Sequence, residues 1–452
     1  MANSRRRDDW AMRYHNYPTL ALAIATCFPH FLAMNRMPDE LSAEADRFRP
    51  DGPYAYARLA LSVLFGTLLG SGMWAVIVVL PSAQAAFGID RSAASLPYTF
   101  TMIGLAIGTI AMGRMADRTG IATPLVIAGL TLGLGFVIAG YAPNLAVFTA
   151  AHGLLIGVGA GTGFGPMMAD ISHWFVKRRG LAVVVVAAGN YVAGTAWPLA
   201  MNLAMPVIGW RASYATIGII VAATVLPLSL LMRRRPSVAA MAEAEEAVRI
   251  ARADVGVSPR LLVGLLVIAG CACCVAMSTP QVHIVAYCGD LGYGVARGAE
   301  MLSLMLFLGI VSRIGSGFVA DAIGGAPTLL ISSFMQGVAL LLYLYFDGLT
   351  SLFVVSGVFG LFQGGIVPMY AVICRELLPP REAGAKIGIV VSATILGMAF
   401  GGYASGLIYD LTGSYHTAFL NGVLWNALNF SLVGWLFLRR RPQSPSGAMS
   451  AA

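Results

Sequence analysis

One charged residue, Arg313, lies well inside a long apolar stretch of the chain, residues 298–320. An ionisable group in such surroundings is costly and usually faces a cavity or a charged partner. A guanidinium keeps its charge there and can donate two parallel hydrogen bonds to a carboxylate. No Asp or Glu occupies the centre of any apolar stretch, so a fixed ion pair lacks its acidic member. We therefore interpret Arg313 as a binding residue for an organic anion.

Two histidines, His152 and His283, lie in other apolar stretches. A neutral imidazole can simply be hydrogen-bonded inside the protein. Because histidine titrates near neutral pH, either residue could also relay a proton. The sequence leaves both interpretations open, whereas Glu300 lies at the edge of its stretch and is expected to be solvated.

Polar and aromatic side chains within the apolar stretches could line a cavity around the anion. Each of them could equally join neighbouring helices by hydrogen bonds. These cavity candidates are Tyr98, Asn190, Tyr191, Gln336, Gln363, Tyr370 and Tyr403. The alternating glycines of residues 157–165 indicate close helix packing rather than a phosphate-binding loop, because no Lys accompanies them.

The six cysteines do not match a metal or redox motif. Cys271, Cys273 and Cys274 share one apolar stretch without histidine partners, and the other three are isolated. The sequence also lacks the ATP-binding loop GxxxxGK[ST] and any recognisable catalytic triad or nucleic-acid signature. We therefore expect apolar packing of the thiols, no cofactor, no metal and no enzymatic activity.

The composition explains why the candidate residues have apolar surroundings. The chain has 452 residues, of which 58% are hydrophobic and 11% charged, whereas soluble proteins have about 25% charged residues. So few charges cannot cover a soluble protein of this size. A membrane-spanning helix needs about 20 apolar residues. Twelve stretches suffice: 59–81, 96–113, 122–142, 145–169, 180–204, 212–232, 261–284, 298–320, 327–346, 350–374, 385–409 and 415–438.

The stretches fall into two groups of six, which predicts an all-α membrane protein with 12 transmembrane helices in two six-helix bundles. The predicted parts are an N-terminal tail (1–58), a bundle (59–232), a linker (233–260), a second bundle (261–438) and a C-terminal tail (439–452). With both termini in the cytosol, 25 Lys and Arg residues fall on the cytosolic side and three on the other, as the positive-inside rule requires. This topology accounts for the net charge of +8 without nucleic-acid binding.

The first 50 residues fit neither bundle. Residues 17–34 are moderately apolar, but Pro18, Pro29 and His30 interrupt them, and a signal peptide would have a cleaner apolar core. We expect a tail that lies on the membrane surface or is disordered. A true start of the chain at Met37 is the alternative.

A short motif recurs in the two predicted bundles. The segments 113–120 (GRMADRTG) and 317–324 (GFVADAIG) share the pattern G-x-x-x-D-x-x-G and begin 204 residues apart. The glycines allow a sharp turn between closely packed helices, and the Asp can face a helix N-terminus or a nearby Arg. Such a contact can latch one conformational state. The residues of this predicted gate are Gly113, Asp117, Arg118, Gly120, Gly317 and Asp321.

On these motifs the chain resembles the major facilitator superfamily, whose loop between helices 2 and 3 carries G-x-x-x-D-R-x-G. The resemblance covers roughly residues 55–440 and departs from the pattern at Ala322, where an Arg is expected. It implies two six-helix bundles, each built from an inverted pair of three-helix repeats. It also implies a central substrate site at the interface between the bundles.

Other segments resemble the monocarboxylate transporter family and its bacterial relatives, the oxalate/formate exchangers. These segments are 174–182 (WFVKRRGLA) with Ala188 and Gly189, 72–81 with 87–91, and 406–415. The resemblance assigns Arg313 as the carboxylate ligand. It also reveals differences, because Gly309 stands where proton-driven members often have Asp, Ser82 lies near where they have Lys, and residues 388–408 lack the Lys of oxalate exchangers. One buried cation suits one carboxylate better than two.

These observations predict a multi-pass transporter in the cytoplasmic or plasma membrane that moves small organic anions, chiefly monocarboxylates, by alternating access. The expected partners of the monomeric transport unit are the anion, a proton or an exchanged anion, and membrane lipid. A drug-efflux carrier on the same fold is one alternative, but no acidic cavity residue is evident. A transport-dead sensor is another, but the C-terminal tail of about 14 residues carries no signalling domain.

Overall fold

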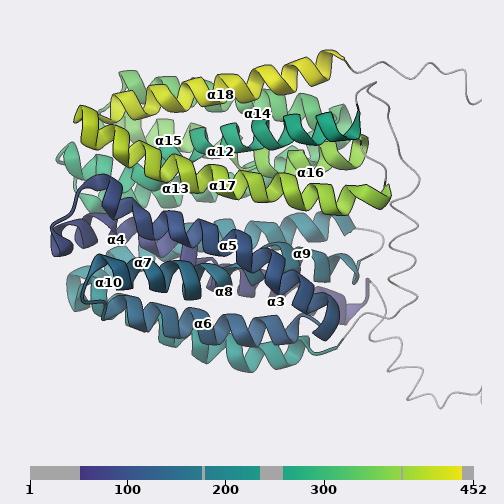
Figure 1. The fold of residues 1–452 in the computed structure, drawn as a ribbon, viewed down its shortest axis with the longest axis horizontal. Coiled ribbons are helices and arrows are strands. Elements are labelled where there is room, and N and C mark those ends of the chain that lie inside the picture. The colour runs from purple at the N-terminus through teal and green to yellow at the C-terminus, as the bar shows by residue number, and fades with distance from the viewer. Residues whose placement is uncertain (1–50, 176–178, 235–257, 378–379, 440–452) are drawn as a thin grey trace, which may run out of the picture.

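The computed structural model of the chain describes residues 51–175, 179–234, 258–377 and 380–439. Most of the predicted tails and of the predicted linker lies outside these residues, and α3 already begins at Pro53, inside the predicted N-terminal tail. All regular structure in the described ranges is helical. Figure 1 shows the described helices up to residue 234, the N-terminal half, lying beside those from residue 258 onward, the C-terminal half.

The N-terminal half begins with two helices that follow each other directly and ends with one long bent helix. In order, it contains α3 (Pro53–Leu69), α4 (Ser71–Phe87), α5 (Arg91–Thr119), α6 (Ala122–Gly140), α7 (Leu145–Ala150), a π-helical turn (Ala151–Gly157), α8 (Val158–Ala160), a 3-10 turn (Gly161–Gly163), α9 (Gly165–Ser172), α10 (Arg179–Ser229) and a 3-10 turn (Leu230–Met232).

The C-terminal half is built from longer uninterrupted helices. In order, it contains α12 (Pro259–Asp290), α13 (Val295–Ile323), α14 (Gly325–Tyr345), α15 (Leu349–Gln363), α16 (Ile366–Leu377), α17 (Pro380–Thr412) and α18 (Tyr415–Leu438).

Ten helical segments of the described chain are long and apolar enough to cross a membrane. One of them, Leu181–Met232, contains a non-helical residue at Gly209 (φ 78°, ψ 160°), where two helical parts of α10 meet. The 24-residue helix α18 is not among the ten. The described chain is thus a multi-pass, all-helical membrane protein.

The two halves place their turns at matching positions. Glycines with positive φ occur as the pairs Gly88 and Gly292, Gly120 and Gly324, and Gly209 and Gly413, and each pair is 204 residues apart. L-residues rarely adopt such φ values, so these positions favour glycine. The 204-residue spacing of the G-x-x-x-D-x-x-G motif therefore also relates turns elsewhere in the two halves. Gly209 corresponds to the turn between α17 and α18, which explains why α10 bends there.

Two helices that the sequence predicts to be continuous are broken in the structure. Predicted span 145–169 contains the π-helical and 3-10 turns, and predicted span 350–374 is interrupted between α15 and α16 at Gly364 and Gly365. Gly161 and Gly365, which mark these breaks, are again 204 residues apart. A Cβ at residue 364 would lie 2.9 Å from the carbonyl carbon of Gly309, so the backbones nearly touch. Irregular backbone at membrane depth is tolerated where it is buried in protein or lines a cavity.

The halves meet along α5 with α17 and along α10 with α13. The Thr99 hydroxyl on α5 donates a hydrogen bond of 3.2 Å to the Ala399 carbonyl on α17. A Cβ at residue 402 of α17 would lie 3.0 Å from the Tyr98 ring on α5. Because Gly402 is small, α5 and α17 approach closely, and the Thr99 hydroxyl of one half reaches a backbone carbonyl of the other. Arg313, on α13, lies at the second of these helix pairs.

Candidate functional site

Arg313 joins the two halves through its guanidinium. Its Nε donates a 3.1 Å hydrogen bond to the Gly364 carbonyl at the break between α15 and α16. Its Nη1 donates a 3.0 Å bond to the Ala187 carbonyl on α10 of the N-terminal half. Only 4% of the residue is exposed. The predicted anion ligand is therefore buried at the interface between the halves.

An aromatic ring, and no acid, lies against this cation. The Arg313 Cζ is 4.2 Å from the centre of the Tyr191 ring. One turn earlier on α13, a Cβ at Gly309 would lie 2.5 Å from a carbon of the same ring. The ring thus fills the space beside residue 309, where the resemblance expected an Asp. A cation–π contact contributes about 2 kcal/mol when it is desolvated, but it leaves the positive charge in place.

No carboxylate within the described residues lies at ion-pair distance from Arg313. Ion pairs between described residues include those of Arg58 with Asp170, Arg91 with Asp290, and Arg297 with Glu300. A guanidinium has five N–H groups, and two on Arg313 donate to carbonyls. The Tyr191 hydroxyl is a further polar neighbour of the guanidinium, and no described carboxylate takes its remaining N–H groups. The arrangement therefore has both the charge and the donors to bind a carboxylate.

Two buried amides lie next to this centre. Gln363, the last residue of α15, precedes the Gly364 carbonyl that Arg313 binds. Its Oε1 accepts a hydrogen bond from Nε2 of Gln281 on α12. Gln363 is 0% exposed and Gln281 1% exposed, and the remaining amide atoms, Gln281 Oε1 and Gln363 Nε2, are buried without partners. Gln281 was not predicted from the sequence, although it directly follows Pro280 inside α12.

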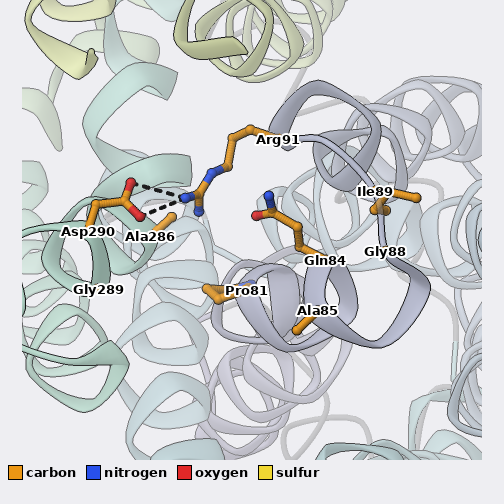
Figure 2. Close-up of a pocket in the computed structure, with 9 residues that line it drawn as sticks. All are labelled: Pro81, Gln84, Ala85, Gly88, Ile89, Arg91, Ala286, Gly289 and Asp290. Carbon is orange, nitrogen blue, oxygen red and sulfur yellow. Dashed lines mark hydrogen bonds and ion pairs between the residues drawn. The ribbon is translucent and has the colours of Figure 1, made fainter. Parts of the chain in front are cut away.

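A second buried arginine joins the halves at one end of the molecule, here called the Arg91 end. Arg91 begins α5, and its Nη2 lies 2.8 Å and 3.0 Å from the two carboxylate oxygens of Asp290 at the end of α12. Figure 2 shows the pair at the edge of a pocket between α4 and α12. The pocket has a volume of about 470 Å³ and is lined by Pro81, Gln84, Ala85, Gly88, Ile89, Arg91, Ala286, Gly289 and Asp290.

The same helix start is capped by the other half. Asp90, the N-cap residue of α5, makes no side-chain capping bond. Instead Asp410, on α17, accepts hydrogen bonds from the backbone N–H groups of Arg91 (2.9 Å) and Ser92 (2.7 Å). A carboxylate at a helix N-terminus is favoured by both the free N–H groups and the helix dipole. Two acids of the C-terminal half thus hold one end of the N-terminal half.

Family models identify the fold class independently. The model of the Major Facilitator Superfamily matches residues 62–349 and 301–451. The chain belongs to the major facilitator superfamily.

Curated relatives point to one branch of the superfamily. The chain is 25% identical over 383 residues to monocarboxylate transporter 13 of Bos taurus, covering 82% of this chain and 86% of that protein. It is 23% identical over 422 residues to monocarboxylate transporter 4 of Gallus gallus, covering 89% and 87%. An uncharacterized MFS-type transporter, YcxA of Bacillus subtilis, is 26% identical over 355 residues, covering 75% and 84%. The chain is a monocarboxylate-transporter-like member of the superfamily, which confirms the predicted resemblance.

The two histidines of this superfamily member have different environments. His283 uses both ring nitrogens, because Nε2 lies 2.8 Å from the Gly402 carbonyl and Nδ1 lies 3.1 Å from the Tyr415 hydroxyl. His152 lies in the π-helical turn, and its Nδ1 is 2.9 Å from the Thr101 hydroxyl. Its Nε2 is buried without a partner. Of the two, only His152 has a ring nitrogen free to exchange a proton or bind water.

Two of the cavity candidates lie between the halves, and two others make contacts within one half. Tyr191 lies against Arg313, and the buried Tyr98 ring lies against Gly402 with its hydroxyl unpartnered. Asn190 accepts from the Trp74 indole N–H through its carbonyl at 2.9 Å and through Oδ1 at 3.2 Å. Gln363, in the C-terminal half, is part of the amide pair described above.

The remaining cavity candidates make contacts inside the C-terminal half or none that the described residues supply. Gln336 donates to the Cys273 carbonyl at 3.4 Å. The Tyr370 hydroxyl donates to Asn429 Oδ1 at 2.6 Å. Tyr403 is half-buried and has no hydrogen-bond partner among the described residues. These three residues are not brought to Arg313 by any contact of the described chain.

The predicted gate lies at the opposite end of α5 from Arg91. Gly120 (φ 83°) and Gly324 (φ 90°) end α5 and α13 in nearly the same conformation. Asp117 is exposed and forms no hydrogen bond or ion pair with a described residue, and Arg118 is also exposed. A Cβ at Gly113 would make an ordinary contact with Pro166 at 3.8 Å, and one at Gly317 would meet nothing within 4 Å. The side chain of Asp321 lies outside the described residues.

Proposed function

We propose that the protein is a secondary transporter of small organic monocarboxylates that works by alternating access. The observation that carries this proposal is Arg313, a buried cation between the halves with no carboxylate partner among the described residues. A substrate carboxylate supplies the missing negative charge. The relatives named monocarboxylate transporters support the same class of substrate. An efflux carrier for cationic drugs would instead need an unpaired acid in place of the Arg313 cation.

The proposal includes twelve membrane spans in a 6+6 arrangement with both termini in the cytosol. Counting the two helical parts of α10 separately and adding α18 raises the ten candidate segments to twelve spans. The 204-residue spacing of the turns supports equal halves. We propose that the Gly120 end is cytosolic and the Arg91 end is outside, which the distribution of Lys and Arg supports. The membrane is the cytoplasmic or plasma membrane, and one chain is the transport unit.

Alternating access requires the two ends to open in turn. In the structure, Asp290 and Asp410 tie α5 to the C-terminal half at the Arg91 end. We assign these bonds to the closed outer gate, which must break when the site opens outward. The G-x-x-x-D-x-x-G turn then latches the cytosolic end through Asp117. Asp117 is exposed while the Arg91 end is closed, which fits an inner latch that is released in this conformation.

Coupling to protons, where it occurs, cannot use residue 309, because Gly309 does not titrate and the Tyr191 ring fills the space beside it. His152 is the better candidate, since one of its nitrogens is unpartnered. Exchange of one anion for another needs no protonatable residue. In both coupling modes, Arg313 has the same role of binding the substrate carboxylate.

The test is uptake of a panel of radiolabelled mono- and dicarboxylates into proteoliposomes, with and without a pH gradient. We expect saturable uptake of monocarboxylates and little uptake of their amides. Uptake of no carboxylate, or equal uptake by protein-free liposomes, contradicts the proposed function. The pH-gradient arm separates proton coupling from anion exchange.

A further inference from the structure

The pocket at the Arg91 end has walls from both halves of the protein. Its volume of about 470 Å³ is within the usual range of small-molecule sites. The N-terminal half contributes the end of α4 and the start of α5, and the C-terminal half contributes Ala286, Gly289 and Asp290 of α12. Ala85, Gly88 and Asp290 are exposed, so the pocket is open to the surface. A cavity with such walls keeps its shape only while the two halves stay together at this end.

Two polar side chains of the pocket have hydrogen-bonding groups without a partner. Arg91 is only 8% exposed, and its guanidinium contacts Asp290 through Nη2 alone. Its Nε is buried without a partner, and its Nη1 donates to no described residue. The half-buried Gln84 amide likewise forms no hydrogen bond with a described residue, and Figure 2 shows it extending toward the Arg91 side chain. These groups favour a ligand that forms hydrogen bonds with them.

The charges of the pocket cancel, which restricts the class of ligand. Arg91 and Asp290 neutralise each other at 2.8 Å. The nearby Asp410 carboxylate is held by the N-terminus of α5, whose helix dipole offsets its charge. An anion in the pocket would be repelled by Asp290, and a cation would be repelled by Arg91. The pocket therefore fits a polar group without net charge.

A carboxamide has both kinds of hydrogen-bonding group that the pocket can use. Its carbonyl oxygen can accept from Arg91 Nη1, and its NH₂ group can donate to Asp290 or to the Gln84 amide oxygen. The rest of the lining suits a hydrocarbon body, because burial of apolar surface is favourable. The apolar lining residues are Pro81, Ala85, Ile89 and Ala286.

We propose that this pocket is a regulatory site for amphipathic carboxamides and that its occupant holds the Arg91 end closed. The inference rests on the proposed assignment of that end to the outer gate. A molecule that contacts both halves binds the conformation in which they are together, so it shifts the equilibrium toward that conformation. Transport then slows although the Arg313 site stays free. Such a compound acts from outside the membrane and is not itself a substrate.

The experiment follows opening of the Arg91 end with a buried reporter cysteine. Ser95 on α5 is 0% exposed, and a Cβ at Gly406 of α17 would lie 2.9 Å from its Oγ. A thiol reagent should therefore reach Ser95→Cys only when the halves separate. The measurement is the labelling rate in purified full-length protein, and the protein with Ser95 unchanged gives the background from the native cysteines.

Three probes with one hydrocarbon body test the charge argument. They are 3-phenylpropanamide, 3-phenylpropanoate and 3-phenylpropan-1-amine. At ten times the concentration that halves the rate, the amide should slow labelling about tenfold, because only the closed state binds it. The amine at the same concentration should slow labelling less than about twofold. The acid should behave like the amine in the Arg313→Ala background, where the proposed central site cannot bind it.

Variants then assign the effect to the pocket. Ala85 lines the pocket and its neighbour Ala86 does not, and both residues are exposed. Ala85→Trp fills the cavity and should reduce the effect of the amide to less than about twofold, whereas the matched control Ala86→Trp should keep the tenfold effect. Gln84→Leu leaves the ion pair in place and should raise the concentration that halves the rate at least about threefold.

Several results would overturn the inference. One is an amide that leaves the labelling rate unchanged up to its solubility limit. Another is slowing that persists in both Ala85→Trp and Gln84→Leu, because the amide then acts elsewhere. Equal slowing by all three probes overturns it as well, since the charge of the polar end should decide. Failure of the proposed function is observed separately, as absence of carboxylate uptake by the wild type. If Ser95→Cys transports but is never labelled, both the gate and the inference are wrong.

Discussion

Two buried arginines, Arg91 and Arg313, lie between the halves of the protein, and their surroundings differ in one decisive respect. Arg91 is 8% exposed and has the carboxylate of Asp290 at 2.8 Å, while Asp410 caps its helix. Arg313 is 4% exposed, donates to two carbonyls and lies against an aromatic ring. A carboxylate neutralises the first arginine, whereas none among the described residues lies at ion-pair distance from the second.

We interpret the difference as that between a structural latch and the proposed anion-binding site. An ion pair whose members come from different halves stabilises the conformation that brings them together, and breaking it leaves a charge without a partner. A cation that receives only carbonyl and aromatic contacts keeps its positive charge available to a ligand. We therefore propose that the Arg91 end controls the conformation and that the centre recognises the anion.

The largest effect should come from removing the central cation. Arg313→Ala is expected to lower the initial rate of monocarboxylate uptake at least about 100-fold, because a buried carboxylate loses its charge partner. Arg313→Lys should lie between this variant and the wild type, since Lys keeps the charge but loses the planar fork. The measurement is uptake into proteoliposomes matched for protein. Arg297→Ala is the control, because Arg297 pairs with Glu300 at an exposed position.

A second change introduces a carboxylate near Arg313, just as Asp290 lies beside Arg91. Gly309→Asp together with Tyr191→Ala adds a carboxylate one turn from Arg313 and removes the ring that would collide with it. The new acid competes with the substrate, so the apparent affinity at neutral pH should fall about tenfold. Protonation of the Asp removes the competitor, and uptake should therefore rise as pH falls, more steeply than in the wild type. A pH profile parallel to that of the wild type contradicts the competition.

Weakening the ion pair between Arg91 and Asp290 should have a smaller effect, which is measured as the rate of thiol labelling at the Arg91 end. Asp290→Asn removes the acid from the Arg91 pair and should favour opening of the Arg91 end. A cysteine at Gln84, which lines the pocket there, should then react about three- to tenfold faster with a membrane-impermeant thiol reagent. Asp410→Asn is the matched comparison, because an amide oxygen still caps a helix. It should change labelling less, and equal labelling in all three proteins counts against the latch.

A smaller change is expected at the exposed acid of the opposite end. Asp117→Asn should slow turnover about threefold while the protein remains inserted and folded, because an exposed charge contributes little energy. The check is the uptake rate relative to equilibrium binding of the same acid. Unchanged turnover in well-expressed protein removes Asp117 from the gate.

The smallest effect on rate at a single pH should follow from His152→Gln. If the free Nε2 of His152 takes part in coupling, the variant flattens the pH dependence of gradient-driven uptake. The Gln amide can keep a hydrogen bond with the Thr101 hydroxyl in place of His152 Nδ1. Full gradient-driven uptake with the wild-type pH profile would leave His152 as a packing residue.

Hydropathy and motif spacing predicted the membrane class, the superfamily and most helices. The repeat of 204 residues was visible in one motif, and the structure extends it to three pairs of turns. Hydropathy could not predict the breaks near Gly161 and at Gly364, because it measures composition and not backbone angles. Both breaks lie in apolar stretches that have the length of a continuous span.

The site was predicted in part. Arg313 was identifiable because a charge inside an apolar stretch is unusual, and its neighbour Tyr191 was on the list of candidates. Gln336 and Tyr370 were on the same list, but amide or hydroxyl type does not reveal which face of a helix is central. Arg91 was overlooked as a binding or gating residue because it begins a helix next to a loop, where charges are ordinary. Its acid partners lie 199 and 319 residues away in the chain.

Equilibrium binding of a radiolabelled monocarboxylate to the purified protein tests the central assignment most directly, because it does not depend on gating or coupling. The account predicts saturable binding to the wild type and to Arg297→Ala, no displacement by the corresponding amide, and loss of binding in Arg313→Ala. Carboxylate binding that survives Arg313→Ala within a few-fold would contradict the account and leave Arg313 as a residue that only joins the halves.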